Sequence, residues 1–209
     1  NNYDKTTKSL NLKSDYVVQI SLSAIRYNPG ETVIVTGVGE PNKQTTMLVK
    51  NEDGKIIHYD VFTSKDDGSL DYRFPIDENN SGGTYSVIIK QDNGADASLF
   101  GIEQYPSSTV VTLMEQSNFS LNSKAILNVI GPQSTKLSVK ILDDNDSIKI
   151  TDSITTSSTG KIRYVVDLDD LPSGIYVAAV GTGKIQDSIK FSVGLESGSG
   201  DITLIATQE

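Results

Sequence analysis

The sequence predicts an all-β protein built from two tandem β-sandwich domains. An internal repeat fills most of the 209 residues, and within each copy short apolar runs are separated by turn residues. The runs recur roughly every 8 to 12 residues, a spacing typical of sandwich folds. No stretch of helix length has the apolar period of an amphipathic helix. Together these observations predict two tandem immunoglobulin-like β-sandwich domains.

The repeat can be checked by comparing residue numbers. Gly160 follows Gly68 by 92 positions, and after one deletion Tyr176 follows Tyr85 by 91. Each copy has about 90 residues, a length at which a single sandwich can bury a core.

The two copies divide the chain into four expected segments. These are an N-terminal tail or linker (1–16), a first Ig-like domain (17–104), a second Ig-like domain (105–193), and a linker with the first strand of a following repeat (194–209). The following repeat is expected because Ile202 and Leu204 stand 91 positions after Val111 and Leu113. The chain is therefore expected to come from a longer array.

Each copy is predicted to form seven strands. In the first copy they are expected over 17–25, 32–38, 46–50, 55–62, 70–76, 85–89 and 97–102. In the second copy they are expected over 110–114, 124–130, 137–142, 147–154, 162–168, 175–180 and 188–193. Apolar and polar residues alternate over 70–76, as in a strand with one buried face. Turns such as Pro29-Gly30 separate the runs, since Pro fixes φ and Gly tolerates positive φ.

A Gly-x-Tyr motif opens the sixth strand of each copy, ending at Tyr85 and at Tyr176. Sandwich domains place a corner tyrosine here, whose hydroxyl bonds back to the main chain. We therefore interpret both tyrosines as structural.

His58 is the only histidine, and a lone imidazole can serve as a general base or a metal ligand. Its equivalent in the second copy is Ile150, 92 positions later. Because that position is apolar, His58 is interpreted as a partly buried strand residue on the same face as Ile56.

The composition limits the partners. The formal charge is −9, and residues 17–104 contribute −6 of it (7 − 13), whereas 105–193 contribute −1 (8 − 9). A negative surface gains nothing by counterion release from a polyanion, so nucleic acid is excluded and cations are favoured as small partners. No run of about 18 apolar residues occurs, so no segment is expected to insert directly into a membrane. Zero Cys excludes disulfides, thiol catalysis and Cys-ligated zinc.

Sequence motifs of common enzymes are missing. There is no Gly-x-Ser-x-Gly elbow, and Gly183-Lys184 is followed by Ile185 and not by the Ser or Thr of a phosphate loop. Most Asp and Glu residues fall in turns or at solvent-facing positions, unlike the paired carboxylates of a glycosidase groove. The sequence therefore predicts no enzymatic activity.

Calcium is the one cofactor that the sequence leaves open, because hard cations bind clustered carboxylates and loop carbonyls. The densest cluster, at a predicted hairpin tip, comprises Asp143, Asp144 and Asp146. Smaller groups are Asp66 with Asp67, Asp169 with Asp170, and the junction carboxylates Glu103, Glu196 and Asp201. None has the spacing of an EF-hand, and a polar hairpin tip needs no metal to explain it.

Three Asn-x-Ser sequons begin at Asn79, Asn118 and Asn145. Each is predicted in a loop, where a glycan could attach. Chance alone predicts nearly as many sequons, so only their placement favours glycosylation.

The string from Tyr27 to Val33 (Tyr-Asn-Pro-Gly-Glu-Thr-Val), the Asp-Gly hairpins and the Gly-x-Tyr-x-Val motif resemble Ig-like repeats of prokaryotic surface proteins. The linker from Phe191 to Gly200 most resembles those in surface-layer proteins of ammonia-oxidising archaea. The resemblance covers both copies, although Ser120-Leu121-Asn122-Ser123 replaces Asn-Pro-Gly-Glu in the second. It implies secreted envelope proteins that form lattices, are often glycosylated and often need divalent cations, without an enzymatic site. The Pro-Gly-Glu pattern also occurs in macroglobulin-like and adhesin repeats.

These observations lead to a main hypothesis with alternatives. We expect a structural module of a secreted cell-surface (S-layer) protein, located in the extracellular envelope, whose partners are copies of itself and cations. The alternative is an adhesin or carbohydrate-binding module, for which Tyr59 and Tyr105 are the non-repeated aromatic candidates. A third hypothesis is a spacer within a secreted hydrolase.

Overall fold

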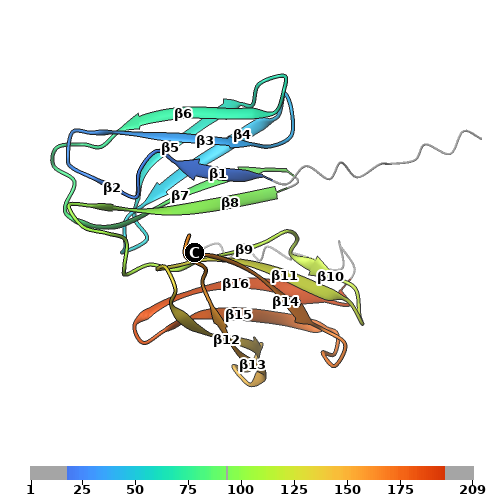
Figure 1. The fold of residues 1–209 in the computed structure, drawn as a ribbon. Coiled ribbons are helices and arrows are strands. Elements are labelled where there is room, and N and C mark those ends of the chain that lie inside the picture. Colours follow the sequence, from blue (N-terminus) through green and yellow to red (C-terminus); the bar gives the residue numbers. More distant parts are fainter. Residues whose placement is uncertain (1–17, 93, 196–209) are drawn as a thin grey trace, which may run out of the picture.

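A computed structural model describes residues 18–92 and 94–195, which form two β-sandwiches and contain no helix (Figure 1). The predicted all-β fold of two tandem Ig-like sandwiches is confirmed. We call the sandwich of β1–β8 domain 1 and that of β9–β16 domain 2. A helix long and apolar enough to cross a membrane is not found among the described residues. The predicted tail over 1–16 and the strand beginning at Ile202 lie outside them.

Each domain contains eight strands. Those of domain 1 are β1 (Gln19–Leu22), β2 (Arg26–Tyr27), β3 (Thr32–Val38), β4 (Gln44–Lys50), β5 (Ile56–Thr63), β6 (Ser69–Pro75), β7 (Gly83–Gln91) and β8 (Gly94–Ile102). Those of domain 2 are β9 (Val111–Met114), β10 (Asn118–Phe119), β11 (Lys124–Ile130), β12 (Lys136–Asp143), β13 (Ile148–Thr155), β14 (Lys161–Asp167), β15 (Gly174–Thr182) and β16 (Ile185–Val193).

The two domains share one sheet topology. Domain 1 packs the three-stranded sheet β1-β3-β6 against the five-stranded sheet β2-β8-β7-β4-β5. Domain 2 packs β9-β11-β14 against β10-β16-β15-β12-β13 in the same way. Neighbouring strands are antiparallel except for the short β2 and β10, which run parallel to β8 and β16.

The first predicted strand, 17–25, is too long, because β1 ends at Leu22 and the chain then crosses to the other sheet. β1 pairs with β3 in one sheet, whereas β2 pairs with β8 in the other. At the break, the backbone N–H of Ala24 donates to the Tyr27 hydroxyl at 2.9 Å, and Ser23 Oγ lies 3.0 Å from the same hydroxyl. The Tyr27 hydroxyl therefore hydrogen-bonds a backbone N–H that is not paired in either sheet.

Both cores follow the alternation expected of half-buried strands. In β6, Leu70 and Phe74 are buried while Asp71 and Arg73 are exposed, as predicted. Burial of each such large apolar side chain contributes about 1.5–3 kcal/mol relative to exposure.

The corner tyrosines predicted in both copies are confirmed. Tyr85 donates from its hydroxyl to the Ser81 carbonyl, and Tyr176 to the Pro172 carbonyl, each at 2.8 Å. Both side chains are buried. Each tyrosine thus fixes the loop that enters the sixth major strand of its domain.

His58 is half-buried in β5 and stacks on Phe74 with ring centroids 5.3 Å apart, which confirms its interpretation as a partly buried strand residue. Its predicted sharing of a face with Ile56 is wrong. A bulge pairs Val49 with His58 but Lys50 with Ile56, so one extra residue lies between the two. Ile56 is therefore turned to solvent and is half exposed.

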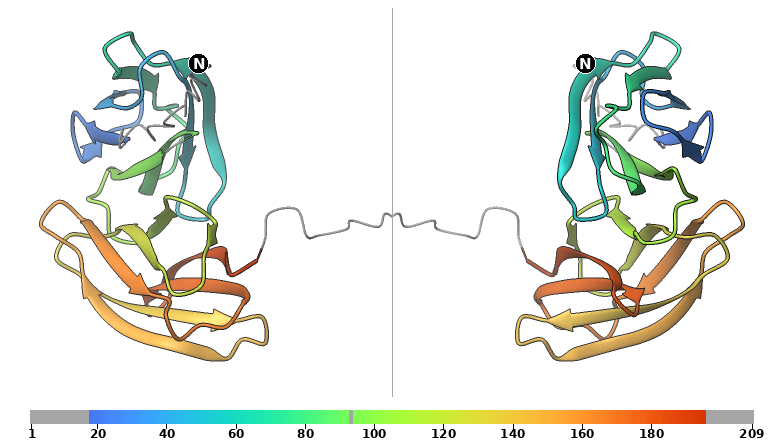
Figure 2. Two further views of the ribbon diagram at one scale, coloured as in Figure 1. Left: turned by 90° about the vertical axis from the view of Figure 1, so that its right-hand side faces the viewer. Right: turned by 90° about the vertical axis from the view of Figure 1, so that its left-hand side faces the viewer.

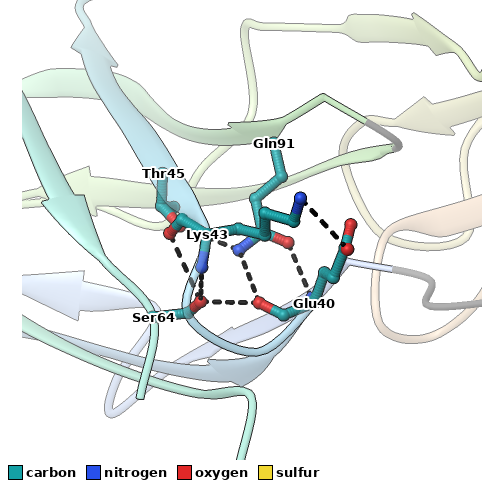
Figure 3. A network of polar contacts seen from close by, with 5 residues as sticks. All are labelled: Glu40, Lys43, Thr45, Ser64 and Gln91. Carbon is teal, nitrogen blue, oxygen red and sulfur yellow. Dashed lines mark hydrogen bonds and ion pairs between the residues drawn. The ribbon is translucent and has the colours of Figure 1, made fainter. Parts of the chain in front are cut away.

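Polar side chains close the end of domain 1 where the β3–β4, β5–β6 and β7–β8 connections meet (Figure 3). Gln91 accepts from the Glu40 N–H and donates to the Thr45 hydroxyl, both at 2.8 Å. Ser64 accepts from the Lys43 N–H at 2.9 Å and donates to the Glu40 carbonyl at 2.6 Å. Because Ser64 and Thr45 are buried, these bonds satisfy polar groups that have no access to water.

Candidate functional site

The two domains meet through apolar side chains that belong to neither core. β8 of domain 1 lies along β9 and β11 of domain 2 (Figures 1 and 2). The contact forms a separate buried cluster, in which no member is more than 7% exposed: Ile88, Ala97, Leu99, Val111, Leu113 and Ile130. Burial of this kind resists separation of the domains.

The outward position of these residues follows from strand alternation. In β7, Val87 and Ile89 point into the core of domain 1, so Ile88 must point outward. Without domain 2, Ile88 and Leu99 would be exposed to water. Sequence reasoning missed this contact, although an apolar run on both faces of one strand is the signal of a strand covered on both sides.

An ion pair joins the domains beside the apolar cluster. Lys161 Nζ lies 2.6 Å from the Asp96 carboxylate and donates to the Ile20 carbonyl at 3.2 Å. Asp96 also accepts from the Ile20 N–H at 2.8 Å. The side chains of Asp96 and Lys161 are 13% and 34% exposed, so water only partly screens this pair.

Half of this arrangement is repeated in domain 2. Asp187, the equivalent of Asp96, accepts from the Thr112 N–H at 2.7 Å. In both domains the aspartate therefore ties the first strand to the opposite sheet. Lys161 has no counterpart in domain 1, where the equivalent residue is Ser69.

The linker between the domains is also bound to domain 1. The N–H groups of Ser107 and Ser108 donate to the buried Thr84 hydroxyl at 3.0 and 3.3 Å, and Ser108 Oγ donates to Glu52 at 2.6 Å. The Gln104 carbonyl approaches Gly101 so closely that a Cβ there would lie 1.9 Å from it. Glycine is therefore required at this position for the linker to follow its path.

An open groove of about 1050 Å³ runs along the junction. Its lining combines the apolar Leu22, Ile25 and Val38 with the cationic Lys161 and Arg163. The groove lining does not concentrate ligand-binding side chains of one kind.

The predicted calcium residues lie at the β12–β13 hairpin tip. Asp143 pairs with Lys149 at 2.8 Å and accepts from the backbone N–H groups of Asn145 and Ser147. These bonds, led by that of Lys149, hold the pKa of Asp143 below its ordinary value. Asp146 adopts a left-handed φ of 59°, where the first copy has Gly54 at 78°, because Asp tolerates this conformation better than most residues. Asp144 accepts from the Asn145 side chain.

Among the described residues, no three His, Cys, Asp or Glu side chains gather as they would around one metal ion. Asp67 accepts from the Ser69 N–H, whereas the neighbouring Asp167 raises the pKa of Asp169. The candidates Glu196 and Asp201 lie outside the described residues. Calcium binding at Asp143, Asp144 and Asp146 stays a prediction.

The three sequons are exposed, but they differ in structure. Asn79 lies in the β6–β7 loop with its side chain bonded to Asp77 at 2.9 Å, and Asn145 lies at the hairpin tip. Asn118 is not in a loop as predicted, because it forms the first residue of β10 and bonds to Ser192. Glycosylation stays a prediction at all three.

A tyrosine–aspartate pair recurs in both domains. Tyr72 donates to Asp60, and the equivalent Tyr164 donates to Asp152 at 2.5 Å. Burial, followed by the bond to the aspartate, raises the pKa of each tyrosine to about 12, while the tyrosine hydroxyl lowers the pKa of each aspartate. The repetition indicates a structural role.

Comparison with known proteins gives one relative in sequence. No protein-family model matches the chain. The chain is similar to S-layer protein B of Metallosphaera sedula, with 24% identity over 159 residues, which cover 74% of this chain and 32% of the relative. The chain thus spans about a third of the relative's length.

Matches to solved structures cover only part of each of those chains. The trypsin-activated alpha-2-macroglobulin of Escherichia coli has 13% identity and a TM-score of 0.36, with 85% of this chain and 16% of that chain covered. The adhesin InvE of Yersinia pseudotuberculosis has 11% identity and a TM-score of 0.33, with 84% and 58% covered. The tetra-tandem repeat of a large adhesion protein has 17% identity and a TM-score of 0.33, with 85% and 48% covered.

Proposed function

We propose that this chain is a structural module of a secreted cell-surface protein and forms part of an S-layer lattice in the cell envelope. The observation that carries the proposal is the similarity to S-layer protein B. The matched 159 residues exceed the length of either domain, so the match includes residues of both. The function is therefore assigned to the pair of domains, with no enzymatic activity.

The junction supports a module that keeps a fixed spacing. Six apolar side chains are buried between the domains, and Lys161 and Asp96 pair beside them. The linker is held by Thr84 and Glu52. A lattice needs subunits of constant shape, and a buried apolar contact with directional bonds at its edge provides this.

The acidic surface supports cations as small partners. The chain has a net charge of −9, of which residues 17–104 contribute −6. Such a surface attracts counterions, and carboxylates of adjacent subunits can share a divalent ion. Asp143, Asp144 and Asp146 are the proposed calcium residues within one chain.

The proposal is tested by imaging native envelopes of the source organism after labelling with an antibody against this chain. A regular array over the whole cell is expected, and a divalent-cation chelator is expected to loosen it. Sparse or polar labelling that a chelator does not change would contradict a lattice role.

A ligand-binding adhesin is the second candidate, because Tyr59 is 59% exposed on β5 and Tyr105 is 64% exposed on the linker. Exposed aromatic rings are the usual platforms for sugars. A glycan-array screen of the chain, with Tyr59→Ala and Tyr105→Ala as separate variants, tests this function. Saturable binding lost in one variant only would favour the adhesin over the lattice module.

A further inference from the structure

The outer face of the five-stranded sheet of domain 2 is basic, although the protein is acidic. Leu137, Val139 and Ile141 of β12 fill the core, so the residues between them point outward. The outward, exposed positions of this sheet hold Lys136, Lys140 and Lys190, Ser and Thr residues such as Ser153, and the apolar Ile148 and Ile175. None of the outward positions on these described strands is Asp or Glu.

On the same face of domain 1, the part formed by β7 and β8 is apolar and is covered by domain 2, whereas Tyr59 and Val61 of β5 are exposed. Leu48 and Leu99 lie in or against the junction cluster, and their equivalents in domain 2 are Lys140 and Lys190. In Figure 1, β12 and β13 lie on the side of domain 2 that is far from domain 1. Lys140 and Lys190 are exposed, whereas Leu48 is partly buried and Leu99 is buried at the equivalent positions of domain 1.

A following repeat cannot cover this face by repeating the first junction. The equivalent of Gly101 is Ser192, which is buried and whose hydroxyl bonds to Asn118. A Cβ at Gly101 would lie 1.9 Å from the linker carbonyl, so a linker after Ser192 cannot take the path seen after Gly101. The two lysines would also be buried, which is unfavourable unless each gains an anionic partner.

A surface of opposite character occurs at one end of domain 1. Glu78 lies 3.7 Å from the Cβ position of Gly30, while Glu103 and Glu52 lie 3.0 and 3.4 Å from those of the adjacent Gly82 and Gly83. With them, in the same loops, are Glu31, Asp53 and Asp77, and all six carboxylates are exposed. Lys55 is the one cation in these loops among the described residues, while Lys50 ends β4 beside them and Lys184 of domain 2 lines the same hollow as Glu52 and Asp53.

We propose that the basic face of domain 2 binds the acidic end of domain 1 in a second copy of the chain. This inference rests on the proposed lattice function and names the surfaces that meet in it. Opposite charges on two exposed surfaces steer subunits together and fix their relative position. Because both surfaces are exposed, the contact weakens as ionic strength rises.

Zero-length carbodiimide cross-linking of an equimolar mixture of the chain at natural isotope abundance and the ¹⁵N-labelled chain tests the contact. We expect cross-links between isotopically different copies that join Lys140 or Lys190 to Glu52, Asp53 or Glu78. Cross-links to the same carboxylates from Lys136, which lies on the same face and keeps its amine, should disappear in the double variant Lys140→Glu/Lys190→Glu, and all the cross-links should weaken at high salt. Lys124→Glu is the matched control, because Lys124 is exposed on the opposite sheet.

Failure to find mixed-isotope cross-links, or their equal occurrence at Lys124, would overturn the proposal. Retention of the chain on anionic lipid vesicles, lost in the double variant and without mixed cross-links, would assign the face to a membrane surface and also overturn it. In isolated envelopes, a cross-link from Lys140 to a carboxylate beyond residue 209 would assign the face to a following repeat and reject the contact. Labelling of a regular array without these cross-links would reject the contact alone, whereas cross-links without an array would reject the lattice function.

Discussion

The five-stranded sheets of the two domains have the same strand order, yet their outer faces differ in character. In domain 1 the part of this face that presents Leu48, Ile88 and Leu99 is covered by domain 2. In domain 2 the equivalent positions hold Lys140, Ala179 and Lys190, and both lysines are exposed.

The inner faces of the same sheets do not differ in this way. Val87 and Ile89 of β7 correspond to Ala178 and Val180 of β15, and all four are completely buried. The core of a sandwich accepts only apolar side chains of suitable volume. The side chain that suits an outward position depends instead on the solvent or the neighbouring domain that it contacts. Divergence between the copies therefore identifies the surfaces that have different neighbours.

Leu99→Lys is expected to have the largest effect. It places in domain 1 the residue that domain 2 has at the equivalent position, Lys190. The ammonium group would enter a cluster in which Leu99 is 7% exposed, and we expect a loss of about 2–3 kcal/mol in the free energy of unfolding. Urea denaturation measures the loss, and small-angle scattering should show an increased radius of gyration.

The reciprocal variant Lys190→Leu serves as the control for Leu99→Lys. Lys190 is exposed, so its replacement should change stability by less than about 0.5 kcal/mol. Equal losses in the two variants would mean that the covered and open faces are not distinct in solution.

Gly101→Ser tests the difference between the two domains at the linker, because it gives domain 1 the serine that domain 2 has at Ser192. The new Cβ would meet the Gln104 carbonyl at 1.9 Å, so the backbone must shift, at a cost of about 1–3 kcal/mol. Calorimetry should show a lower melting temperature. Ser192→Gly is the reciprocal change and should cost about 1 kcal/mol, from a freer unfolded backbone and lost hydroxyl bonds. A smaller loss for Gly101→Ser than for Ser192→Gly would contradict the close approach.

Lys161→Met should have a smaller effect, because the ion pair is partly exposed. We expect a loss of about 1 kcal/mol that shrinks as salt is added. A double-mutant cycle with Asp96→Asn isolates the coupling between the two side chains. Arg163→Met is the control, since Arg163 and Glu115 are 3.9 Å apart and both largely exposed. Additive losses in the cycle would show that the pair does not join the domains.

The fold was predictable because its determinants are local. Gly68 and Gly160 have φ values of 80° and 78°, in the left-handed region that other residues rarely adopt. Such positions tolerate little except glycine, so they remain visible in the sequence as a repeat. Alternation in strands such as β6 is similarly local, because neighbouring residues point to opposite faces.

The junction was not predictable because its determinants are distant in sequence. Lys161 and Asp96 are 65 positions apart, and no local pattern links them. The apolar Ile88 between the inward Val87 and Ile89 indicates a strand covered on both faces, but no local pattern indicates which part of the chain covers it. The bulge that turns Ile56 outward was missed for a related reason, because it depends on how β4 and β5 pair.

The smallest expected effect concerns a feature that the two domains share, the tyrosine–aspartate pairs. The pKa values of Tyr72 and Tyr164 are raised to about 12 from 10.0, so each protonated tyrosine stabilises the folded state fully below about pH 10 and less as pH rises toward 12. The pKa values of Asp60 and Asp152 are lowered from 3.8, so their contribution is full above about pH 4 and declines in acid.

Replacing both tyrosines with Phe should therefore flatten the alkaline decline in stability between about pH 10 and 12, relative to the unmodified chain. Urea denaturation at a series of pH values measures this, with the seven other tyrosines as a common background in both proteins. The single variants Tyr72→Phe and Tyr164→Phe should contribute alike, since both hydroxyls bond to equivalent aspartates. An effect confined to one domain would contradict the equivalence of the two tyrosine–aspartate bonds. It would mean that the copies differ in these bonds as well as on the surfaces that have different neighbours.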